Sequence, residues 1–370
     1  MKVVIVLATV FLKCGAKVIG LLKVCNIFAK KIQKKLHLFT KALIMSKVLG
    51  MGNALVDILA RLDSDDLLKK LDFPKGSMQL VDAETSAKVL EEITNHTKEQ
   101  ASGGSAANTI HGLSCLGVAS GFFGKVGKDE LGAFFKKDMS ENNIEPKLLE
   151  SDNDSGKAVA LISPDSERTF ATYLGAAVEL SADDVVEELF HGYTHFHIEG
   201  YLVYNQPLIE KALKCAKEAN LIISLDLASF NVVEDNHAFL KDMVAKYVDI
   251  LFANEEEAKA FTNKEHKAAL DEMAQDCNIA VLKLGKEGSL IKHFETTFEV
   301  GVIKANSIDT TGAGDLYAAG FLYGLINLLP LDKCGEIGAL LSGNVIEVVG
   351  PKMESDRWDK IHSELEKLRN

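Results

Sequence analysis

The sequence lacks the marks of several common protein classes. Only one Trp occurs among 370 residues, and the six cysteines form no Cys-x-x-Cys pair. This usage argues against a disulfide framework or a zinc site and indicates reduced thiols, as in the cytoplasm. No Gly-x-x-x-x-Gly-Lys-[Ser/Thr] segment occurs, which argues against a P-loop ATPase. The Gly-x-Gly-x-x-Gly fingerprint is missing too, which argues against a nicotinamide enzyme.

Acidic residues outnumber basic ones outside the first 45 residues. This segment holds nine Lys and no Asp or Glu, whereas the whole chain has a net charge of −12. The remainder is therefore strongly acidic, which argues against nucleic-acid binding, because that function needs a basic surface. An anionic small-molecule substrate is compatible with this charge, since backbone dipoles bind phosphate locally. The content of 47% hydrophobic and 25% charged residues is typical of a globular protein with a sizeable core.

Residues 1–45 differ in pattern from the rest of the chain. Their apolar run, Val3–Leu12, is about half the length of a membrane span, and no clean cleavage site follows it. We expect residues 1–45 to be an upstream extension, as a mis-set start would produce, before a protein that begins near Met45–Ser46. A membrane-surface amphipathic segment and an export signal are the alternatives. We expect no membrane partner.

From Lys47 on, strand-like apolar runs alternate with helical patterns, as in layered α/β folds. The predicted strands are Val48–Ile58, Ser120–Val126, Ala158–Ile162, Thr169–Tyr173, His195–Ile198, Ile222–Asp226, Ile250–Phe252 and Ala280–Leu284. The predicted helices are Ala106–Leu116, Glu130–Asn142, Pro207–Ala219, Glu255–Phe261, Lys267–Asp276, Gly314–Leu328, Cys334–Val348 and Asp356–Leu368. No repeat or low-complexity linker interrupts them, so we predict one domain over residues 46–370. Two strand-rich stretches without helices, about 57–81 and 155–175, are predicted to form a small projecting sheet.

The strongest motif is the segment Asp309-Thr310-Thr311-Gly312-Ala313-Gly314-Asp315, followed by an apolar helix. Glycines at a helix start let the backbone approach an anion, and free N–H groups with the helix dipole supply positive potential. Asp315 lies in the first turn, where a carboxylate can accept the proton of an attacking hydroxyl during phosphoryl transfer. In the alternative interpretation, Thr311 or Asp309 caps the helix and Asp315 complements its dipole.

Two further motifs suit the binding of hydroxyl groups. Gly103 and Gly104 permit a tight turn before a helix whose first turn carries Asn108, an amide that can bind hydroxyls. In Gly52-Asn53-Ala54-Leu55-Val56-Asp57, a carboxylate follows the first strand, at the edge where open α/β sheets bind ligands. Ordinary turn chemistry explains each segment equally well.

Two motifs suit the nucleotide side of a kinase. Asn254-Glu255-Glu256-Glu257 follows a strand, and Glu257 could hold Mg²⁺ through water, although Asn-x-x-Glu is also a capping box. Gly285-Lys286-Glu287-Gly288 also follows a strand, and either a nucleotide loop or a simple turn accounts for it. His195 and His197 alternate on one strand without a third ligand, so we interpret them as ordinary strand residues.

In their joint order these motifs resemble the ribokinase-like family of sugar and nucleoside kinases, from about Ser46 to the C-terminal helix. The resemblance rests on Gly103-Gly104…Asn108 and on Asp309–Asp315, with support from Gly52…Asp57, Phe123–Asp129 and Asn254…Glu257. Within the family the chain looks most like the adenosine kinase branch. The resemblance implies a three-layer αβα sandwich with a mostly parallel central sheet and a small β-sheet lid.

The resemblance also implies roles for the matched residues. Asp315 is the expected catalytic base, and the expected anion hole comprises Gly312, Ala313 and Gly314. The expected substrate-binding residues are Asn53, Asp57, Gly103, Gly104, Asn108 and Arg168, where Arg168 would neutralise phosphate. ATP and Mg²⁺ are the expected cofactors, associated with Asn254, Glu257, Gly285 and Gly288. A monovalent cation such as K⁺ is a further expectation beside Asp309 and Thr311.

The expected reaction is ATP-dependent phosphorylation of a primary hydroxyl of a ribonucleoside, adenosine to AMP. One departure is Ala107, because the adenosine branch usually carries a polar residue just before its Asn. Tyr201 is the candidate for an aromatic contact with the base. The alternatives are a kinase of ribose, fructose or a related sugar, and a binding or regulatory protein that has kept the fold and lost turnover. The pattern gives no oligomeric state.

Overall fold

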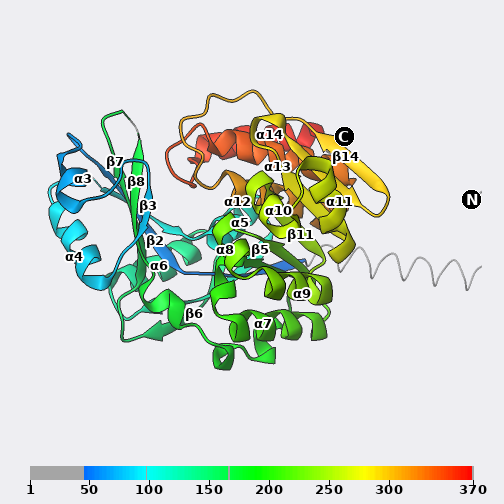
Figure 1. Ribbon diagram of the computed structural model, residues 1–370, viewed down its shortest axis with the longest axis horizontal. Coiled ribbons are helices and arrows are strands. Elements are labelled where there is room, and N and C mark those ends of the chain that lie inside the picture. Colours follow the sequence, from blue (N-terminus) through cyan, green and yellow to red (C-terminus); the bar gives the residue numbers. More distant parts are fainter. Residues whose placement is uncertain (1–45, 97, 166, 369–370) are drawn as a thin grey trace, which may run out of the picture. The chain divides into compact units, whose positions relative to one another are not determined.

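A computed structural model describes residues 46–96, 98–165 and 167–368. By internal contacts the chain divides into residues 1–45 and residues 46–370. The interpretations of residues 1–45 lie outside the described residues. Two β-sheets and their helices make up the described part (Figure 1).

The large sheet has nine strands in the described part of the chain, in the order β14-β13-β12-β11-β10-β9-β1-β5-β6. Six neighbouring pairs, from β12 to β6, are parallel, while β12–β13 and β13–β14 are antiparallel. The strands are β1 (Lys47–Met51), β5 (Ala119–Gly127), β6 (Ile144–Ser151), β9 (His195–Glu199), β10 (Ile222–Asp226), β11 (Ile250–Asn254), β12 (Ile279–Lys283), β13 (Ser289–His293) and β14 (Thr296–Val300).

Helices cover both faces of this sheet. Successive side chains of a strand point to opposite faces, so apolar residues next to each other in a strand are buried under helices on different sides. In β1, Val48 belongs to one apolar cluster and Leu49 to another. The Val48 cluster includes α5 (Ser105–Cys115), α6 (Glu130–Glu141), α12 (Ala313–Ile326), α13 (Leu331–Val345) and α14 (Ser355–Leu368). The Leu49 cluster includes α7 (Gln206–Glu218), α8 (Phe230–Asp235), α9 (His237–Tyr247), α10 (Glu255–Thr262) and α11 (His266–Asp276). The predicted αβα sandwich with a mostly parallel sheet is confirmed.

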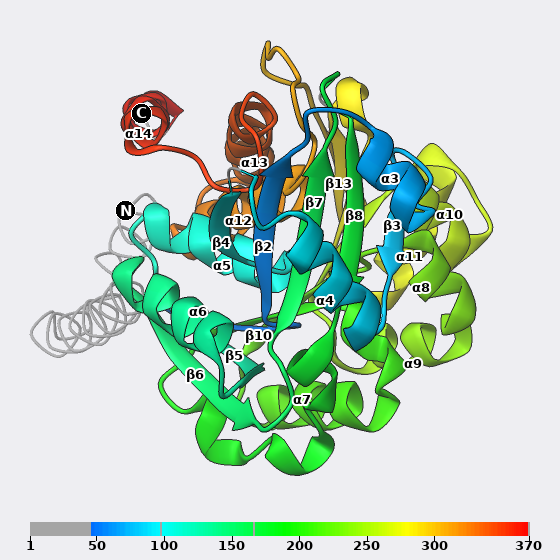
Figure 2. The same cartoon turned by 90° about the vertical axis from the view of Figure 1, so that its left-hand side faces the viewer.

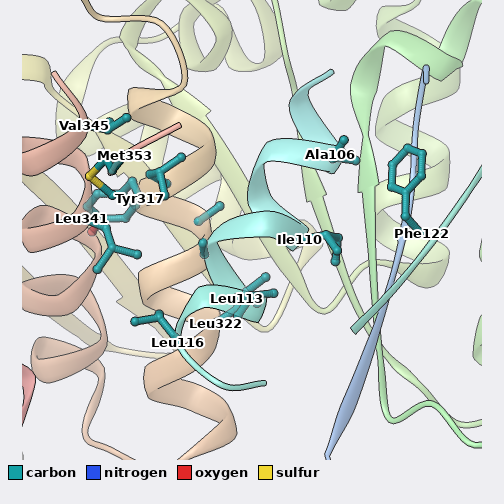
Figure 3. Close-up of a cluster of buried hydrophobic side chains, with 14 of the residues drawn as sticks. Ala106, Ile110, Leu113, Leu116, Phe122, Tyr317, Leu322, Leu341, Val345 and Met353 are labelled. Atoms are coloured by element: carbon teal, nitrogen blue, oxygen red, sulfur yellow. The ribbon is translucent and has the colours of Figure 1, made fainter. Parts of the chain in front are cut away.

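The packing of α5, α12 and α13 fixes the two helices that carry the strongest motifs. Ile110 and Leu113 of α5 are fully buried, as are Leu316 of α12 and Leu341 of α13. Figure 3 shows these helices side by side, with the apolar side chains between them. Each fully buried side chain of this size contributes about 1.5–3 kcal/mol relative to exposure, so the first turns of α5 and α12 are held on a rigid support.

The small sheet has the order β3-β8-β7-β2-β4. Together with α3 (Asp66–Leu71) and α4 (Ala83–Glu92) it projects from the body at the left of Figure 1, and it faces the viewer in Figure 2. Its strands are β2 (Leu55–Arg61), β3 (Met78–Leu80), β4 (Lys98–Gly103), β7 (Gly156–Ile162) and β8 (Arg168–Tyr173). The segments predicted for it, about 57–81 and 155–175, leave out β4. The first also contains helix α3, contrary to the prediction of a stretch without helices.

The predicted strand Val48–Ile58 is wrong as one element. The chain leaves the large sheet after Met51 and enters the small sheet at Leu55. A continuous apolar pattern hides this change of sheet, because both strands bury side chains. In β2, Val56 and Ile58 belong to the apolar cluster, whereas Asp57 alternates with them and points to the other face. Within the described residues, no helix has the length and apolar character that crossing a membrane would require.

Candidate active site

Helix α12 begins at the glycine motif, and the structure explains why glycine is needed there. Gly312 precedes the helix with φ +75°, a left-handed conformation that disfavours other residues. A Cβ at Gly312 would also lie 2.6 Å from Cβ of Pro351. The turn is thus closely packed, and Asp315 is the acidic residue of the first turn. No side chain caps this helix, so the interpretation that Thr311 or Asp309 caps it is wrong.

The Asp315 carboxylate is held by two donors from the start of α5. Ser105 Oγ donates to Oδ1 at 2.7 Å, and Asn108 Nδ2 donates to Oδ2 at 2.9 Å. Thr109 Oγ1 donates to the backbone oxygen of Asp315 at 3.1 Å. Burial raises the pKa of Asp315 to about 6, although the hydrogen bonds from Asn108 and Ser105 oppose the rise. The two strongest motifs of the sequence therefore meet at one carboxylate whose orientation is fixed.

The turn between β4 and α5 brings Asp57 to the same place. Gly104 has φ +100°, and a Cβ there would lie 2.3 Å from the Asn53 backbone oxygen. A Cβ at Gly103 would lie 2.3 Å from Oδ2 of Asp57. Burial raises the pKa of Asp57 to about 7, opposed by Lys352 and supported by Asp315. No described residue donates a hydrogen bond to the Asp57 carboxylate, which leaves its oxygens free for a ligand.

Glu199, at the end of β9, is a site residue that the sequence interpretation missed. Its Oε1 accepts from the backbone N and from Nδ2 of Asn53, each at 2.9 Å, and its Oε2 accepts from Ala106 N at 2.9 Å. Burial raises the pKa of Glu199 to about 7, against the effect of these donors. Glu199 thus links the β1–β2 connection to the first turn of α5. Its position directly after the predicted strand His195–Ile198 was the available signal.

Lys352 is a second missed residue, next to Asp57. Its Nζ donates to Ser102 Oγ at 3.2 Å. Burial lowers the pKa of Lys352 to about 8, against the opposite effects of Asp138 and Asp57. The residue lies between α13 and α14, where no motif marked it. It supplies the positive charge near the free carboxylate of Asp57.

A cavity of about 890 Å³ opens beside Asp315 and the start of α12. Its charged lining includes Asp226 at the end of β10, Lys283 at the end of β12 and Glu257 in the first turn of α10. The lining also includes the glycines Gly285, Gly288 and Gly314 and the side chain of Tyr201. Small and mostly apolar residues complete much of the lining, namely Val302, Ile303, Ala305, Ala339, Ser342, Gly343 and Ile346. The cavity therefore offers both charged groups, among them Asp315, and apolar surface.

Asn254 and Glu257 form the capping box that the sequence indicated as one alternative. Glu257 N donates to Asn254 Oδ1 at 2.9 Å, and Asn254 N donates to Glu257 Oε2 at 2.8 Å. Burial raises the pKa of Glu257 to about 7, while Lys283 opposes the rise. The described residues contain no cluster of three or more His, Cys, Asp or Glu side chains that could hold a metal ion. A divalent cation here would thus be bound by phosphate oxygens of a ligand and by water beside Glu257. Mg²⁺ suits such a site, because it usually keeps several water ligands.

Arg168 contacts the loop before α12. Its Nη1 pairs with Oδ2 of Asp309 and donates to Thr311 Oγ1 at 3.3 Å. The Asp309 carboxylate also accepts from Thr311 N at 3.0 Å and from Gly350 N at 2.7 Å. Arg168, Asp309 and Thr311 therefore lie together, and the small sheet is tied to the loop that leads into α12.

Comparisons with known proteins agree with this fold. Residues 77–356 match the model of the pfkB family carbohydrate kinases. A nucleoside kinase from Methanocaldococcus jannaschii is 30% identical over 276 residues, which cover 72% of this chain and 86% of the relative. A 5-dehydro-2-deoxygluconokinase from Geobacillus thermodenitrificans is 29% identical over 302 residues, or 76% of this chain and 89% of the relative. The solved structure of adenosine kinase from Sinorhizobium meliloti has a TM-score of 0.77 and 33% identity, covering 86% of this chain and 99% of that one.

The fold and the site define a small-molecule kinase with a central parallel sheet and a second, smaller sheet. More specifically, the chain belongs to the pfkB family of carbohydrate kinases, since the match spans more than half of it. The predicted relation to ribokinase-like sugar and nucleoside kinases is confirmed. The relatives include both nucleoside and sugar kinases, so membership alone gives the reaction type and not the acceptor.

Proposed function

We propose that this chain transfers the γ-phosphoryl group of ATP to a primary hydroxyl of a ribonucleoside, with adenosine converted to AMP. The observation that carries the proposal is the carboxylate of Asp315, which Ser105 and Asn108 orient at the glycine turn of α12. A general base must stand close to the proton that it removes. Asp315 lies where the acceptor side, at Asp57 and Asn108, meets the cavity that would take the nucleotide.

In the proposed mechanism, the acceptor hydroxyl loses its proton to Asp315 as its oxygen bonds to the γ-phosphorus. The bond from that phosphorus to the β–γ bridging oxygen breaks, and ADP leaves. The backbone at Gly312, Ala313 and Gly314 stabilises the charge on the transferred group. The raised pKa of Asp315, about 6, makes it a stronger base than an ordinary aspartate while it remains ionised at neutral pH.

On the acceptor side, Asp57, Gly103, Gly104, Asn53 and Asn108 would hold the sugar hydroxyls. The free oxygens of the Asp57 carboxylate support this role, because an ionised carboxylate accepts hydrogen bonds from a diol. Asn53 would act through the turn, since Glu199 occupies its amide nitrogen.

On the nucleotide side, ATP would occupy the 890 Å³ cavity, with its base against the apolar lining. Mg²⁺ would be coordinated by phosphate oxygens and by water held at Glu257, with Asn254 fixing that side chain. Gly285 and Gly288, both at positive φ in the cavity wall, would let the backbone approach the phosphates.

Arg168 is proposed to neutralise phosphate from the small sheet, which we propose acts as a lid. Its present partners are Asp309 and Thr311, so this role requires Arg168 to exchange them for the ligand. K⁺ at Asp309 and Thr311 belongs to the same proposal, and it competes with Arg168 for Asp309.

The choice of a nucleoside rests on two observations. The segments Gly52–Asp57 and Gly103–Ser105 resemble the corresponding segments of the adenosine kinase branch, and the chain is similar to the Sinorhizobium meliloti adenosine kinase. Tyr201, at the cavity wall, is the candidate aromatic contact for the base. The sugar-kinase alternative has support in the similarity to the gluconokinase relative. A binding protein without turnover is disfavoured, because it would have no need for a fixed base at a glycine turn.

The test is product analysis after incubation with ATP, Mg²⁺ and a panel of nucleosides and sugars. The account predicts that adenosine has a higher kcat/KM than ribose or fructose, since the base adds buried contact and an absent base leaves pocket groups unpaired. A free pentose or hexose with a higher kcat/KM than every nucleoside would change the assignment to a sugar kinase.

A further inference from the structure

Lys283, the last residue of β12, is a partly buried cation in the lining of the cavity. Its Nζ lies 2.6 Å from Oδ2 of Asp226, and the two side chains are 15% and 7% exposed. Burial would lower the pKa of Lys283, but Asp226 and Glu257 outweigh it and raise the pKa, with a further contribution from Asp315. Lys283 therefore remains charged throughout the neutral range.

The ammonium group of Lys283 lies against the glycine turn of α12. A Cβ built on Gly314 would be 3.1 Å from Lys283 Nζ. Gly314 and Asp315 are consecutive, so the cation lies beside both the proposed anion hole and the proposed base. Lys283, Gly314 and Asp315 all line the same cavity.

The hydrogen bonding of Lys283 is incomplete. An ammonium has three N–H donors, and the only acceptor found for Lys283 among the described residues is Asp226. Two donors are left for water or a ligand. Asp226 is itself fixed, because its Oδ1 accepts from Ala228 N at 3.1 Å. Asp226 thus holds the Lys283 ammonium group in place without using all of its hydrogen-bond donors.

Charge balance makes this cation significant for the reaction. The cavity lining contains five carboxylates (Asp226, Glu255, Glu256, Glu257 and Asp315) and two ammonium groups (Lys283 and Lys286). A triphosphate adds further negative charge, which a divalent cation can only partly offset. Lys286 is exposed, whereas Lys283 lies at the turn where the transferred group would be.

We propose that Lys283 contacts the transferred phosphoryl group and stabilises its charge, and that Asp226 is the positioning residue that holds Lys283 at Gly314. This inference rests on the proposed function and adds a catalytic cation to it. On phosphate entry, the two free donors of Lys283 take phosphate oxygens, while its bond to Asp226 persists. No proton moves to or from Lys283 in this step.

The test compares the wild type with Lys283→Met. A donor to the transferred group is typically worth about 10²–10³-fold in kcat, so we expect a loss of this size. The affinity for ADP, measured by calorimetry with Mg²⁺ and no acceptor, should stay within about threefold, because ADP lacks the group that Lys283 contacts. A loss of affinity for a non-hydrolysable ATP analogue with ADP binding unchanged locates the contact on the γ-phosphoryl group.

Three further variants separate this role from a structural one. Lys283→Arg should recover part of the lost kcat. The double variant Asp226→Asn/Lys283→Met removes both charges, avoids an unpaired buried carboxylate, and should fold yet remain slow. Lys292→Met is the matched control, because Lys292, on the neighbouring strand β13, is 18% exposed, pairs with Asp271 of α11, and does not line the cavity. It should alter melting alone.

A Lys283→Met enzyme that turns over within about threefold of wild type would overturn the proposal. Equal losses of ADP and ATP-analogue affinity, together with early melting, would also overturn it, since they indicate a structural ion pair. Both of these outcomes concern the Lys283→Met variant. If the proposed function itself is wrong, the wild type would bind Mg²⁺ and ATP but phosphorylate no acceptor, so the two kinds of failure can be distinguished.

Discussion

At the scale of single residues, the site depends on carboxylates that burial makes more basic. Burial raises the pKa values of Asp315 to about 6 and of Asp57 to about 7; the charge of Asp315 adds to the rise at Asp57, and that of Asp226 adds to the rise at Asp315. Both must be ionised in the proposed mechanism, one to accept a proton and one to bind hydroxyls. The same shifts oppose stability, because a carboxylate with a raised pKa in the folded state loses stabilisation as the pH rises through that range.

The pH dependence of kcat/KM tests these two groups. Because both carboxylates must be deprotonated, kcat/KM should be constant above about pH 8, fall below about pH 7, and fall more steeply below about pH 6. Steady-state assays in a constant-ionic-strength buffer series provide the measurement. A flat profile from about pH 5 to 8 would show that neither group titrates in the reaction.

Asp57→Asn separates acceptor binding from chemistry. The proposed bonds of Asp57 exist in both the ground state and the transition state, so the change should appear mainly in KM of the acceptor, raised by about 10- to 100-fold. The melting temperature at pH 8 should rise, because Asn removes a carboxylate whose charged form burial disfavours. A large fall in kcat with unchanged KM would contradict the role assigned to Asp57.

At the scale of elements, two glycine turns orient the first turns of α5 and α12, so that Ser105 and Asn108 meet Asp315. The sequence predicted both helices and both turns, because each turn combines glycines with a following apolar helical pattern. It did not predict that Glu199, Asp226 and Lys283 line up at strand ends. Their proximity depends on the strand order and on the side-chain pairs made across it, which no local pattern encodes.

Gly104→Ala tests the turn before α5. Its φ of +100° strains any other residue, and a Cβ would meet the Asn53 oxygen at 2.3 Å. We expect a loss of more than about 2 kcal/mol in the free energy of unfolding and a fall in kcat as α5 shifts from Asp315. Gly117→Ala is the control, since Gly117 has φ +81° with no atom within 4 Å of the built Cβ. It should cost about 1–2 kcal/mol with normal kcat; equal effects in both variants would contradict the account.

At the scale of the whole molecule, the small sheet is joined to the site at several points. β2 carries Asp57, β4 leads into Gly104, and β8 carries Arg168 next to Asp309. The sequence missed β4, Lys98–Gly103, because its polar residues give no apolar alternation. It also merged β1 with β2, since the short Gly52–Ala54 connection lies between two apolar strands. The sequence nevertheless identified the residues of that connection as site residues, because their motif can be recognised even where the strand boundaries are predicted wrongly.

A chain shortened to residues 46–370 should keep the activity and solubility of the full chain. The reason is the contrast in composition, since residues 1–45 hold nine Lys and no acid, and the family match begins at residue 77. Equal kcat/KM and equal melting temperatures of the two chains would agree with this prediction. Loss of folding in the shortened chain would refute it.

Asp315→Asn tests the central claim most directly. Asn keeps the shape of the side chain but cannot accept the hydroxyl proton, so kcat should fall by about 10²–10⁴-fold while substrate affinity stays nearly unchanged. If Asp315 merely complements the dipole of α12, the expected effect is a stability loss of about 0.3–1 kcal/mol with near-normal turnover. Steady-state kinetics and a melting curve on the same sample distinguish these results. An Asp315→Asn enzyme within a few-fold of wild-type kcat would contradict the mechanism.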